Sequence, residues 1–279
     1  MPYIEREGKI RLHYELDDYT DPWRNAPYLL LQHGFGRSSK FWYSWVPYLS
    51  RHFKVVRPDL RGLGKSTATL EPGANVGEIF VEDLNAIIAT LGADSVHYCG
   101  EALGGTLGAA LAATHPERVR TLTLVSSPVY LSKREKETTT YGHASRIESM
   151  KKMGVRAWAE ASNSGRRFPP ETDQGMLRWY VDQMGESSLD VLIAISTWLE
   201  DFSAVPYLAK VQAPVLGLYA ANGPIIDNEQ LSLLKAQLRN FRFVRVPSEY
   251  QAIQNFKPAT CANEVLHFAA QHDGYACHE

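Results

Sequence analysis

One segment constrains the fold more than any other, and it runs from Ser95 to Thr114 with the sequence SVHYCGEALGGTLGAALAAT. An apolar run that ends at Cys99 predicts a buried strand, and small residues from Gly104 onward predict a closely packed helix. Glycines between the two let the backbone turn sharply and let strand and helix approach each other. The segment therefore predicts a strand-turn-helix elbow.

The tip of this elbow holds an alanine. The pattern G-x-S-x-G places a nucleophilic serine at the strained tip of such a turn. Here the pentapeptide is Gly100-Glu101-Ala102-Leu103-Gly104, so a methyl group stands where the pattern has a hydroxyl. Serine hydrolysis needs a hydroxyl that a base can activate. Hydrolysis through an acyl-enzyme is therefore excluded for this chain.

Composition excludes several other classes of function. The net charge of −2 on 279 residues offers no electrostatic footprint for nucleic acid or an anionic membrane surface. No apolar run is long enough to span a bilayer, and the N-terminus lacks the apolar core of a signal peptide. The three cysteines show no metal-type spacing. We expect a cytoplasmic protein with no metal or organic cofactor; its oligomeric state is left open.

Strand and helix patterns alternate around the elbow, which predicts an α/β fold with a doubly wound, mostly parallel sheet. The alternation stops in one place, where residues 131–208 read as several helices. We interpret residues 1–130 and 209–279 as the core and residues 131–208 as an inserted helical cap. Ligands of such sheets bind outside the carboxyl ends of the strands. Function is expected in the loops after Gln32, Cys99, Val125, Tyr219 and Val246.

Large apolar side chains are frequent in the expected cap. Packing between cap and core is the favoured explanation for any single one of them, because large apolar groups in helices are usually buried against neighbours. Trp158 and Trp179 are the two that we take as candidates for contact with a substrate.

Three motifs occur in a fixed order and spacing along the chain: HGFG at 33–36, DLRGLGKS at 59–66, and GEALGG at 100–105. With the cap in its place, the chain resembles the α/β-hydrolase superfamily, in the branch of esterases, enol-lactonases and carbon-carbon bond hydrolases. The resemblance implies an oxyanion hole made by the backbone N–H groups of Phe35 and Leu103. It also places Gly34 beside this hole, together with His33, which is a structural residue in that family.

The resemblance locates a catalytic acid and a catalytic base, and both are substituted. The acid after the seventh strand aligns with Gly223, and the other place for an acid, after the sixth strand, holds Ser126. The base aligns with Gln251 in the loop after the last strand. With Ala102 at the nucleophile position, all three roles of the triad are vacant.

Three functions remain open for such a chain. In the first, it is an unconventional enzyme that acts on a small, mostly apolar carbonyl compound through the oxyanion hole, with Glu101 as a candidate proton-transfer group and Tyr250 nearby in the former base loop. We favour a structural role for Glu101, bonding a neighbouring loop or the cap. In the second, the chain is a ligand-binding pseudoenzyme. In the third, it is an esterase or lactonase inactivated by a serine-to-alanine change.

Overall fold

The computed structural model describes residues 2–67, 69–70, 74–163, 166–223 and 226–274. Its strands, in chain order, are β1 (Tyr3–Arg6), β2 (Ile10–Asp17), β3 (Tyr28–Gln32), β4 (Lys54–Pro58), β5 (Val96–Glu101), β6 (Val119–Val125), β7 (Val215–Ala220) and β8 (Phe241–Val246). They form one sheet in the order β1-β2-β4-β3-β5-β6-β7-β8. Strands β1 and β2 pair antiparallel, as does β2 with β4, and the other neighbours pair parallel. The expected doubly wound, mostly parallel sheet is confirmed.

The α-helices, in chain order, are α1 (Val46–Leu49), α2 (Val76–Thr90), α3 (Leu103–Thr114), α4 (Lys133–Thr138), α5 (Arg146–Met153), α6 (Val155–Ser162), α7 (Gln174–Gly185), α8 (Leu189–Asp201), α9 (Val205–Leu208), α10 (Asn228–Gln237), α11 (Ile253–Phe256) and α12 (Pro258–Asp273). Short 3-10 turns span Glu7–Lys9, Ser39–Trp42 and Pro116–Arg118. None of the helices in the described ranges is long and apolar enough to cross a membrane.

Side chains of the central strands point alternately to the two faces of the sheet and pack into two separate hydrophobic cores. Leu29 and Leu31 of β3 pack with Trp45 and with residues of α12 on one face of the sheet. Leu30 of β3 and Tyr98 of β5 pack with α2 and α3 on the other face. Because both faces are covered, the central strands are almost entirely buried, and every residue of β5 is buried.

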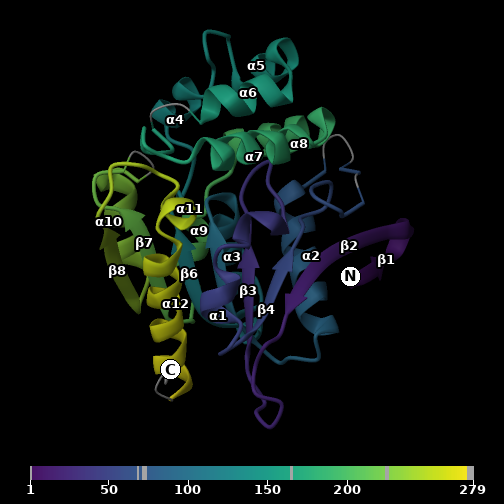
Figure 1. Ribbon diagram of the computed structural model, residues 1–279, viewed down its shortest axis with the longest axis vertical. Coiled ribbons are helices and arrows are strands. Elements are labelled where there is room, and N and C mark those ends of the chain that lie inside the picture. Colours follow the sequence, from purple (N-terminus) through teal and green to yellow (C-terminus); the bar gives the residue numbers. More distant parts are fainter. Residues whose placement is uncertain (1, 68, 71–73, 164–165, 224–225, 275–279) are drawn as a thin grey trace.

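Helices α4 to α8 form a layer of their own. Figure 1 shows them above the end of the sheet at which the parallel strands finish, while α12 and α2 flank the sheet below. Large residues of this layer, among them Tyr180, Leu192 and Ile195, are fully buried in the core that also contains α2 and α3. The helical layer is therefore packed against the loops that follow the parallel strands.

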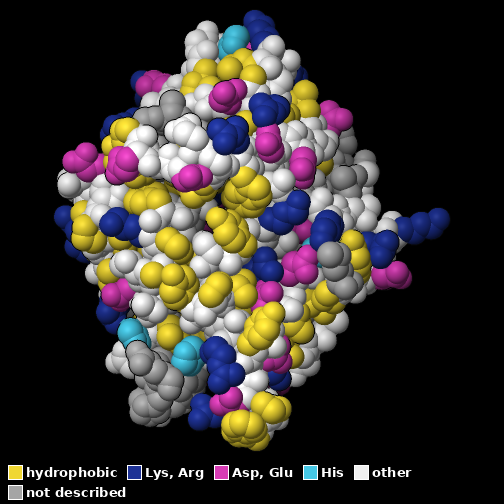
Figure 2. Space-filling view, in the orientation of Figure 1, with side chains coloured by type: hydrophobic (Ala, Val, Ile, Leu, Met, Phe, Trp, Pro, Cys, Tyr) yellow, Lys and Arg dark blue, Asp and Glu magenta, His cyan; other side chains and the backbone are white. Residues whose placement is uncertain are grey.

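The opposite end of the molecule carries exposed aromatic side chains. Tyr19 and Trp23 are 65% and 79% exposed in the loop between β2 and β3. Figure 2 shows hydrophobic side chains at the lower tip of this face, where Figure 1 places that loop. This end lies far from the helical layer.

Candidate active-site cavity

The elbow between β5 and α3 has the geometry expected from its glycines. Ala102 has φ 48° and ψ −117°, a left-handed conformation that a residue with a Cβ rarely adopts. A Cβ on Gly100 would meet the backbone of Gly104 and Gly105, and a Cβ on Gly104 would meet the carbonyl oxygen of Gln32. The turn is thus held from two sides by backbone that cannot move away.

This packing predicts an unequal response to alanine at two glycines. We expect Gly100→Ala to lower the free energy of unfolding by about 3 kcal/mol, since overpacking against backbone cannot be relieved by a rotamer change. Gly92 is the matched control, because its φ is +67° and nothing lies within 4 Å of its added Cβ. Gly92→Ala should lower the free energy of unfolding by only about 1 kcal/mol, because backbone strain is its sole cost. Urea unfolding measures both values, and equal losses would contradict the close packing at the elbow.

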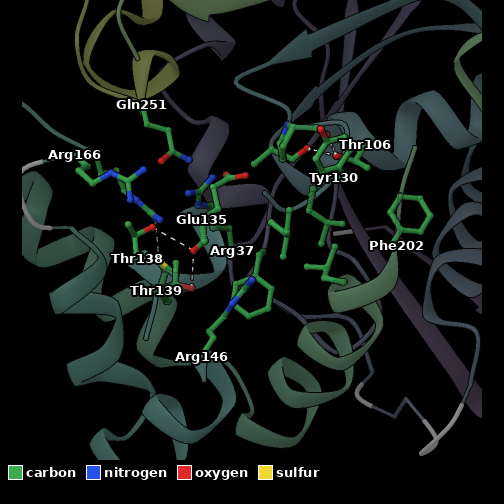
Figure 3. Close-up of a pocket in the computed structure, with 18 of the residues that line it drawn as sticks. Arg37, Thr106, Tyr130, Glu135, Thr138, Thr139, Arg146, Arg166, Phe202 and Gln251 are labelled. Atoms are coloured by element: carbon green, nitrogen blue, oxygen red, sulfur yellow. Dashed lines mark hydrogen bonds between the residues drawn. The ribbon is translucent and has the colours of Figure 1, made fainter. Parts of the chain in front are cut away.

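Ala102 lies at the wall of a cavity between the elbow and the helical layer. The cavity has a volume of about 130 Å³, and since about 10–15 Å³ of such volume holds one water, a small organic molecule fits. Figure 3 shows side chains from the elbow, the helical layer and the loop after β8 converging on it. The lining residues that the chemistry below depends on are Phe35, Arg37, Ala102, Leu103, Tyr130, Glu135, Arg146, Trp158, Arg166, Arg167 and Gln251.

Phe35 and Leu103 both line this cavity beside Ala102. Leu103 is the first residue of α3, so its N–H has no acceptor inside the helix. Within the described residues, no hydrogen bond uses the N–H of Phe35 or of Leu103 as a donor. Two residues that line the cavity on neighbouring segments therefore have backbone N–H groups without an acceptor in the described part of the chain.

The loop after β8 brings Gln251 to the same cavity. The side chain of Gln251 points into the cavity in Figure 3. The main-chain carbonyl of Gln251 accepts a hydrogen bond of 2.9 Å from the Ser126 hydroxyl, so the position after β6 lies next to the position after β8. Gly223 is not among the residues that line the cavity, and its N–H donates to the Ala220 carbonyl at 3.3 Å. The structure thus brings Ala102, Ser126 and Gln251 together and leaves Gly223 outside this group.

Glu101 does not line the cavity. Its carboxylate accepts a hydrogen bond from the Arg37 guanidinium, and both residues are buried. Burial opposes the charge of Arg37, but Glu101 and Tyr180 more than offset this and raise the pKa of the guanidinium. The contact fits the structural role favoured for Glu101, bonding a neighbouring loop, better than the proton-transfer role.

His33 is also turned away from the cavity. Its Nε2 accepts from the Leu60 N–H at 3.1 Å, so Nδ1 carries the proton and donates to the Gly34 carbonyl at 2.8 Å. Burial lowers the pKa of this imidazole. A neutral ring with both nitrogens engaged fixes the loop after β3 and has no free position for a substrate proton.

The aromatic candidates separate into one that lines the cavity and two that do not. Trp158 lines the cavity and packs edge-on against Phe35, with ring centres 5.9 Å apart. Trp179 packs instead against Phe41 at 5.0 Å, beside a different surface hollow. Tyr250 packs against Phe256 and is not among the lining residues.

The cavity is more polar than the sequence suggests, because four arginines and one glutamate line it. Arg146 begins α5, Arg166 and Arg167 lie between α6 and α7 of the helical layer, and Arg37 comes from the loop after β3. A mostly apolar ligand does not suit this wall, since guanidinium groups facing a dry ligand would stay unsolvated. The sequence holds one signal that could have located Glu135: Ser132 followed three residues later by Glu is a helix-capping pattern.

Glu135 is a lining group whose ionisation is strongly altered. Burial raises its pKa from 4.5 to about 7, against the opposing effects of hydrogen bonds from Ser132 and the charges of Arg146 and Arg166. A carboxyl group with such a pKa changes its protonation state near neutral pH.

This shift predicts how stability varies with pH. Between pH 4.5 and about 7 the unfolded chain has lost this proton and the folded chain has kept it, so stability falls as pH rises. The shift corresponds to about 3 kcal/mol. We expect Glu135→Gln to remove this dependence, so that its stability relative to wild type rises by about that amount from pH 4.5 to 7.5. Urea unfolding of both proteins at matched pH values measures the difference; parallel pH curves would contradict the raised pKa.

Solved structures of other proteins resemble the fold of this chain closely. The enol-lactonase from Burkholderia xenovorans superimposes with a TM-score of 0.84 at 22% identity, covering 96% of this chain and 100% of that one. A hydrolase from Pseudomonas aeruginosa superimposes with a TM-score of 0.82 at 23% identity, covering 96% and 97%. At such identities the likeness shows the fold alone.

Curated relatives match over part of the chain. A protein of Agrobacterium fabrum named "Putative carbamate hydrolase RutD" is 31% identical over 150 residues, which are 54% of this chain and 55% of that protein. The corresponding protein of Caulobacter segnis is 36% identical over 98 residues, 35% of this chain and 37% of that one. The chain spans about half the length, or less, of the curated relatives it matches. The sequence model of the alpha/beta hydrolase fold, however, matches residues 27–258. The chain is therefore a member of the α/β-hydrolase family.

Proposed function

We propose that the chain binds a small carbonyl compound in the Ala102 cavity and acts on it without forming an acyl-enzyme. The carbonyl oxygen accepts hydrogen bonds from the N–H groups of Phe35 and Leu103. The observation that carries the proposal is the conformation of Ala102, which keeps φ 48° although no nucleophile stands there. Residues 131–208 act as the cap that covers the bound compound.

The strained tip gives the elbow a use that does not depend on a hydroxyl. A left-handed conformation at a residue with a Cβ is unfavourable by about 1–2 kcal/mol. At Ala102 this conformation starts α3 with the N–H of Leu103 at the cavity wall. A preorganised donor of this kind is worth about 2.7–4 kcal/mol to a developing oxyanion, which exceeds the strain.

The buried pair of Arg37 and Glu101 supports the same two donors. Arg37 follows Phe35 in the loop after β3, and Glu101 ends β5 just before the elbow. Their contact therefore ties together the two segments that carry the proposed carbonyl donors. We assign the pair a positioning role.

Covalent catalysis is not part of the proposal, because no group at the triad positions can carry it. Ala102 has no nucleophilic atom, Gln251 has no basic nitrogen, and Ser126 donates its hydroxyl to the carbonyl of Gln251. Stabilisation of a negative oxygen needs none of these groups. A non-covalent reaction such as proton transfer next to a carbonyl remains compatible with the cavity.

Binding of 2-pentanone tests the proposal. We expect Ala102→Asp to weaken this binding about 10-fold, because the new carboxylate occupies the two N–H donors and the ligand loses a hydrogen bond. Ala102→Gly is the matched control, since it removes a methyl group and leaves both donors free. NMR titration measures the dissociation constants; equal affinities of the two variants would contradict a carbonyl site at these donors.

The same ketone separates catalysis from binding. In D₂O, an enzyme that stabilises the enolate should accelerate exchange of the protons next to the carbonyl. A ligand-binding pseudoenzyme would bind the ketone and leave the exchange rate unchanged. We expect acceleration by the wild type and its loss in Ala102→Asp.

A further inference from the structure

The geometry points to a second recognition element in the Ala102 cavity: a carboxylate-binding site at Arg146. We infer that the ligand is a short oxo acid, a compound that carries a carboxylate a few atoms away from its carbonyl group. The position of the carbonyl rests on the proposed function, whereas the carboxylate site rests on Arg146 alone.

Arg146 is the best-buried guanidinium of the helical layer that lines the cavity. It is the first residue of α5 and is only 7% exposed. Its Nε has no hydrogen-bond partner, and within the described residues its guanidinium makes no ion pair. Figure 3 shows the side chain directed from its helix into the cavity. The group is therefore buried, charged and unpartnered, and it faces open space.

Such a group is unfavourable unless something pairs with it. The effective penalty for burying one ion is several kcal/mol. Burial lowers the pKa of Arg146, with Glu200 and Glu135 only partly opposing this from a distance. The single close compensation is the ring of Phe35, whose centre lies 5.4 Å from the guanidinium carbon. A cation–π contact supplies about 2 kcal/mol at most in such sites and leaves the N–H groups without acceptors.

Two other arginines of this chain with little exposure, Arg61 and Arg37, have fixed carboxylate partners. Arg61 binds both carboxylate oxygens of Asp83, at 2.8 and 2.6 Å, and Arg37 binds Glu101. Fixed carboxylates therefore satisfy these two guanidinium groups. Within the described part of the chain, Arg146 has no such fixed partner, and it lines a cavity large enough for a ligand, which makes a mobile carboxylate its natural partner.

The surroundings of Arg146 add positive charge. Arg166 and Arg167 line the same cavity, each with a buried Nε that lacks a partner. Backbone hydrogen bonds hold them there, because the carbonyls of Arg166 and Arg167 accept from the N–H groups of Gln251 and Ala252 at 3.1 and 3.0 Å. Among the described residues that line the cavity, Glu135 is the one acidic side chain. Three arginines against one glutamate leave an excess of two positive charges when Glu135 is ionised.

The class of anion follows from the geometry of the guanidinium. Its planar fork binds a carboxylate through two parallel hydrogen bonds. Of the three lining arginines without a fixed carboxylate partner in the described ranges, Arg146 alone is buried, so one negative charge suffices to neutralise it. Its contact with the Phe35 ring places the carboxylate near the residue whose N–H is a proposed carbonyl donor. This closeness limits the separation between carboxylate and carbonyl to a short chain of atoms.

Three probes of one length test the carboxylate and the carbonyl independently. Pentanoate carries only the carboxylate, 2-pentanone only the carbonyl, and 4-oxopentanoate carries both. Affinities are measured by NMR titration at constant ionic strength for the wild type, Arg146→Met and Arg146→Lys. Arg178→Met is the matched control, because Arg178 is an exposed arginine of α7 in the same helical layer.

We expect Arg146→Met to weaken the binding of pentanoate and of 4-oxopentanoate at least 10-fold, because a charge-assisted hydrogen-bonded pair is lost. The affinity for 2-pentanone should change less than 2-fold. Arg146→Lys should recover part of the carboxylate binding, and Arg178→Met should leave all three affinities unchanged. A thermal unfolding scan without ligand should show Arg146→Met folded and at least as stable as wild type.

Two results would overturn the inference. One is equal pentanoate binding by the wild type and Arg146→Met; the other is binding of inorganic phosphate by the wild type with no binding of pentanoate. Failure of the proposed function looks different: 4-oxopentanoate would then bind no tighter than pentanoate, while both would still depend on Arg146.

Discussion

Replacing Ala102 with serine alone is expected to give no hydrolysis of p-nitrophenyl acetate above the level of Ala102→Gly. The hydroxyl would stand at the tip of the elbow with Gln251 beside it, and an amide cannot accept the proton of the attacking serine. Removing the base from a working triad costs about as much as removing the nucleophile. Restoring one of the three groups therefore restores almost nothing.

Completing the triad should change this result. The Ser126 hydroxyl donates to the main-chain carbonyl of Gln251 at 2.9 Å, so positions 126 and 251 are adjacent and an aspartate at 126 is the acid nearest to a histidine at 251. Ser126 has φ 46°, which aspartate tolerates. We expect Ala102→Ser/Ser126→Asp/Gln251→His to hydrolyse the ester at least ~100-fold faster than Ala102→Ser, since a base and its orienting acid contribute up to about 10⁴-fold.

The control is the same triple variant with glycine at 102, which should stay inactive. Rapid hydrolysis by Ala102→Ser itself, with a stoichiometric burst of nitrophenol, would show that another base reaches position 102. In that case the chain would be an inactivated esterase, and the non-covalent proposal would be wrong.

The second large effect is expected at the buried pair of Arg37 and Glu101. Glu101→Gln leaves the Arg37 guanidinium buried without a counter-charge, and breaking a buried pair in this way typically lowers stability by about 3–5 kcal/mol. Arg37→Met/Glu101→Leu removes both charges and should lie within about 1 kcal/mol of the wild type. Urea unfolding of the wild type, Arg37→Met, Glu101→Leu and the double variant gives the coupling energy between the two side chains.

An exposed pair provides the comparison. Arg242 and Glu264 lie 3.0 Å apart at the surface, and Glu264→Gln should lose less than about 1 kcal/mol. If Glu101→Gln lost no more than this, the pair could not hold the elbow and the loop after β3 together. The positioning role assigned to it would then be untenable.

The fold was predictable because local sequence signals and the final structure agree. The glycines around Ala102 predicted the elbow, and its left-handed backbone and close contacts follow from them. The break in strand-helix alternation predicted helices over residues 131–208, where α4 to α9 are found. Such patterns depend on residues that are close in the sequence, so they can be recognised without the tertiary structure.

The wall of the cavity was less predictable, because it depends on how the helices pack. Trp158 and Trp179 looked equivalent in the sequence, yet only Trp158 lines the cavity. Arg146 carries no local signal at all, and its importance appears only when its burial is set against its lack of a partner. The direction of a side chain from an inserted helix is fixed by contacts distant in sequence.

The carbonyl ¹³C resonance of bound 2-pentanone tests the central claim most directly. Two N–H donors at the carbonyl oxygen withdraw electron density from the carbonyl carbon, so the account predicts a downfield shift on binding to the wild type and none on binding to Ala102→Asp. A bound ketone whose resonance stays where it is in water, or shifts equally in both proteins, would contradict it.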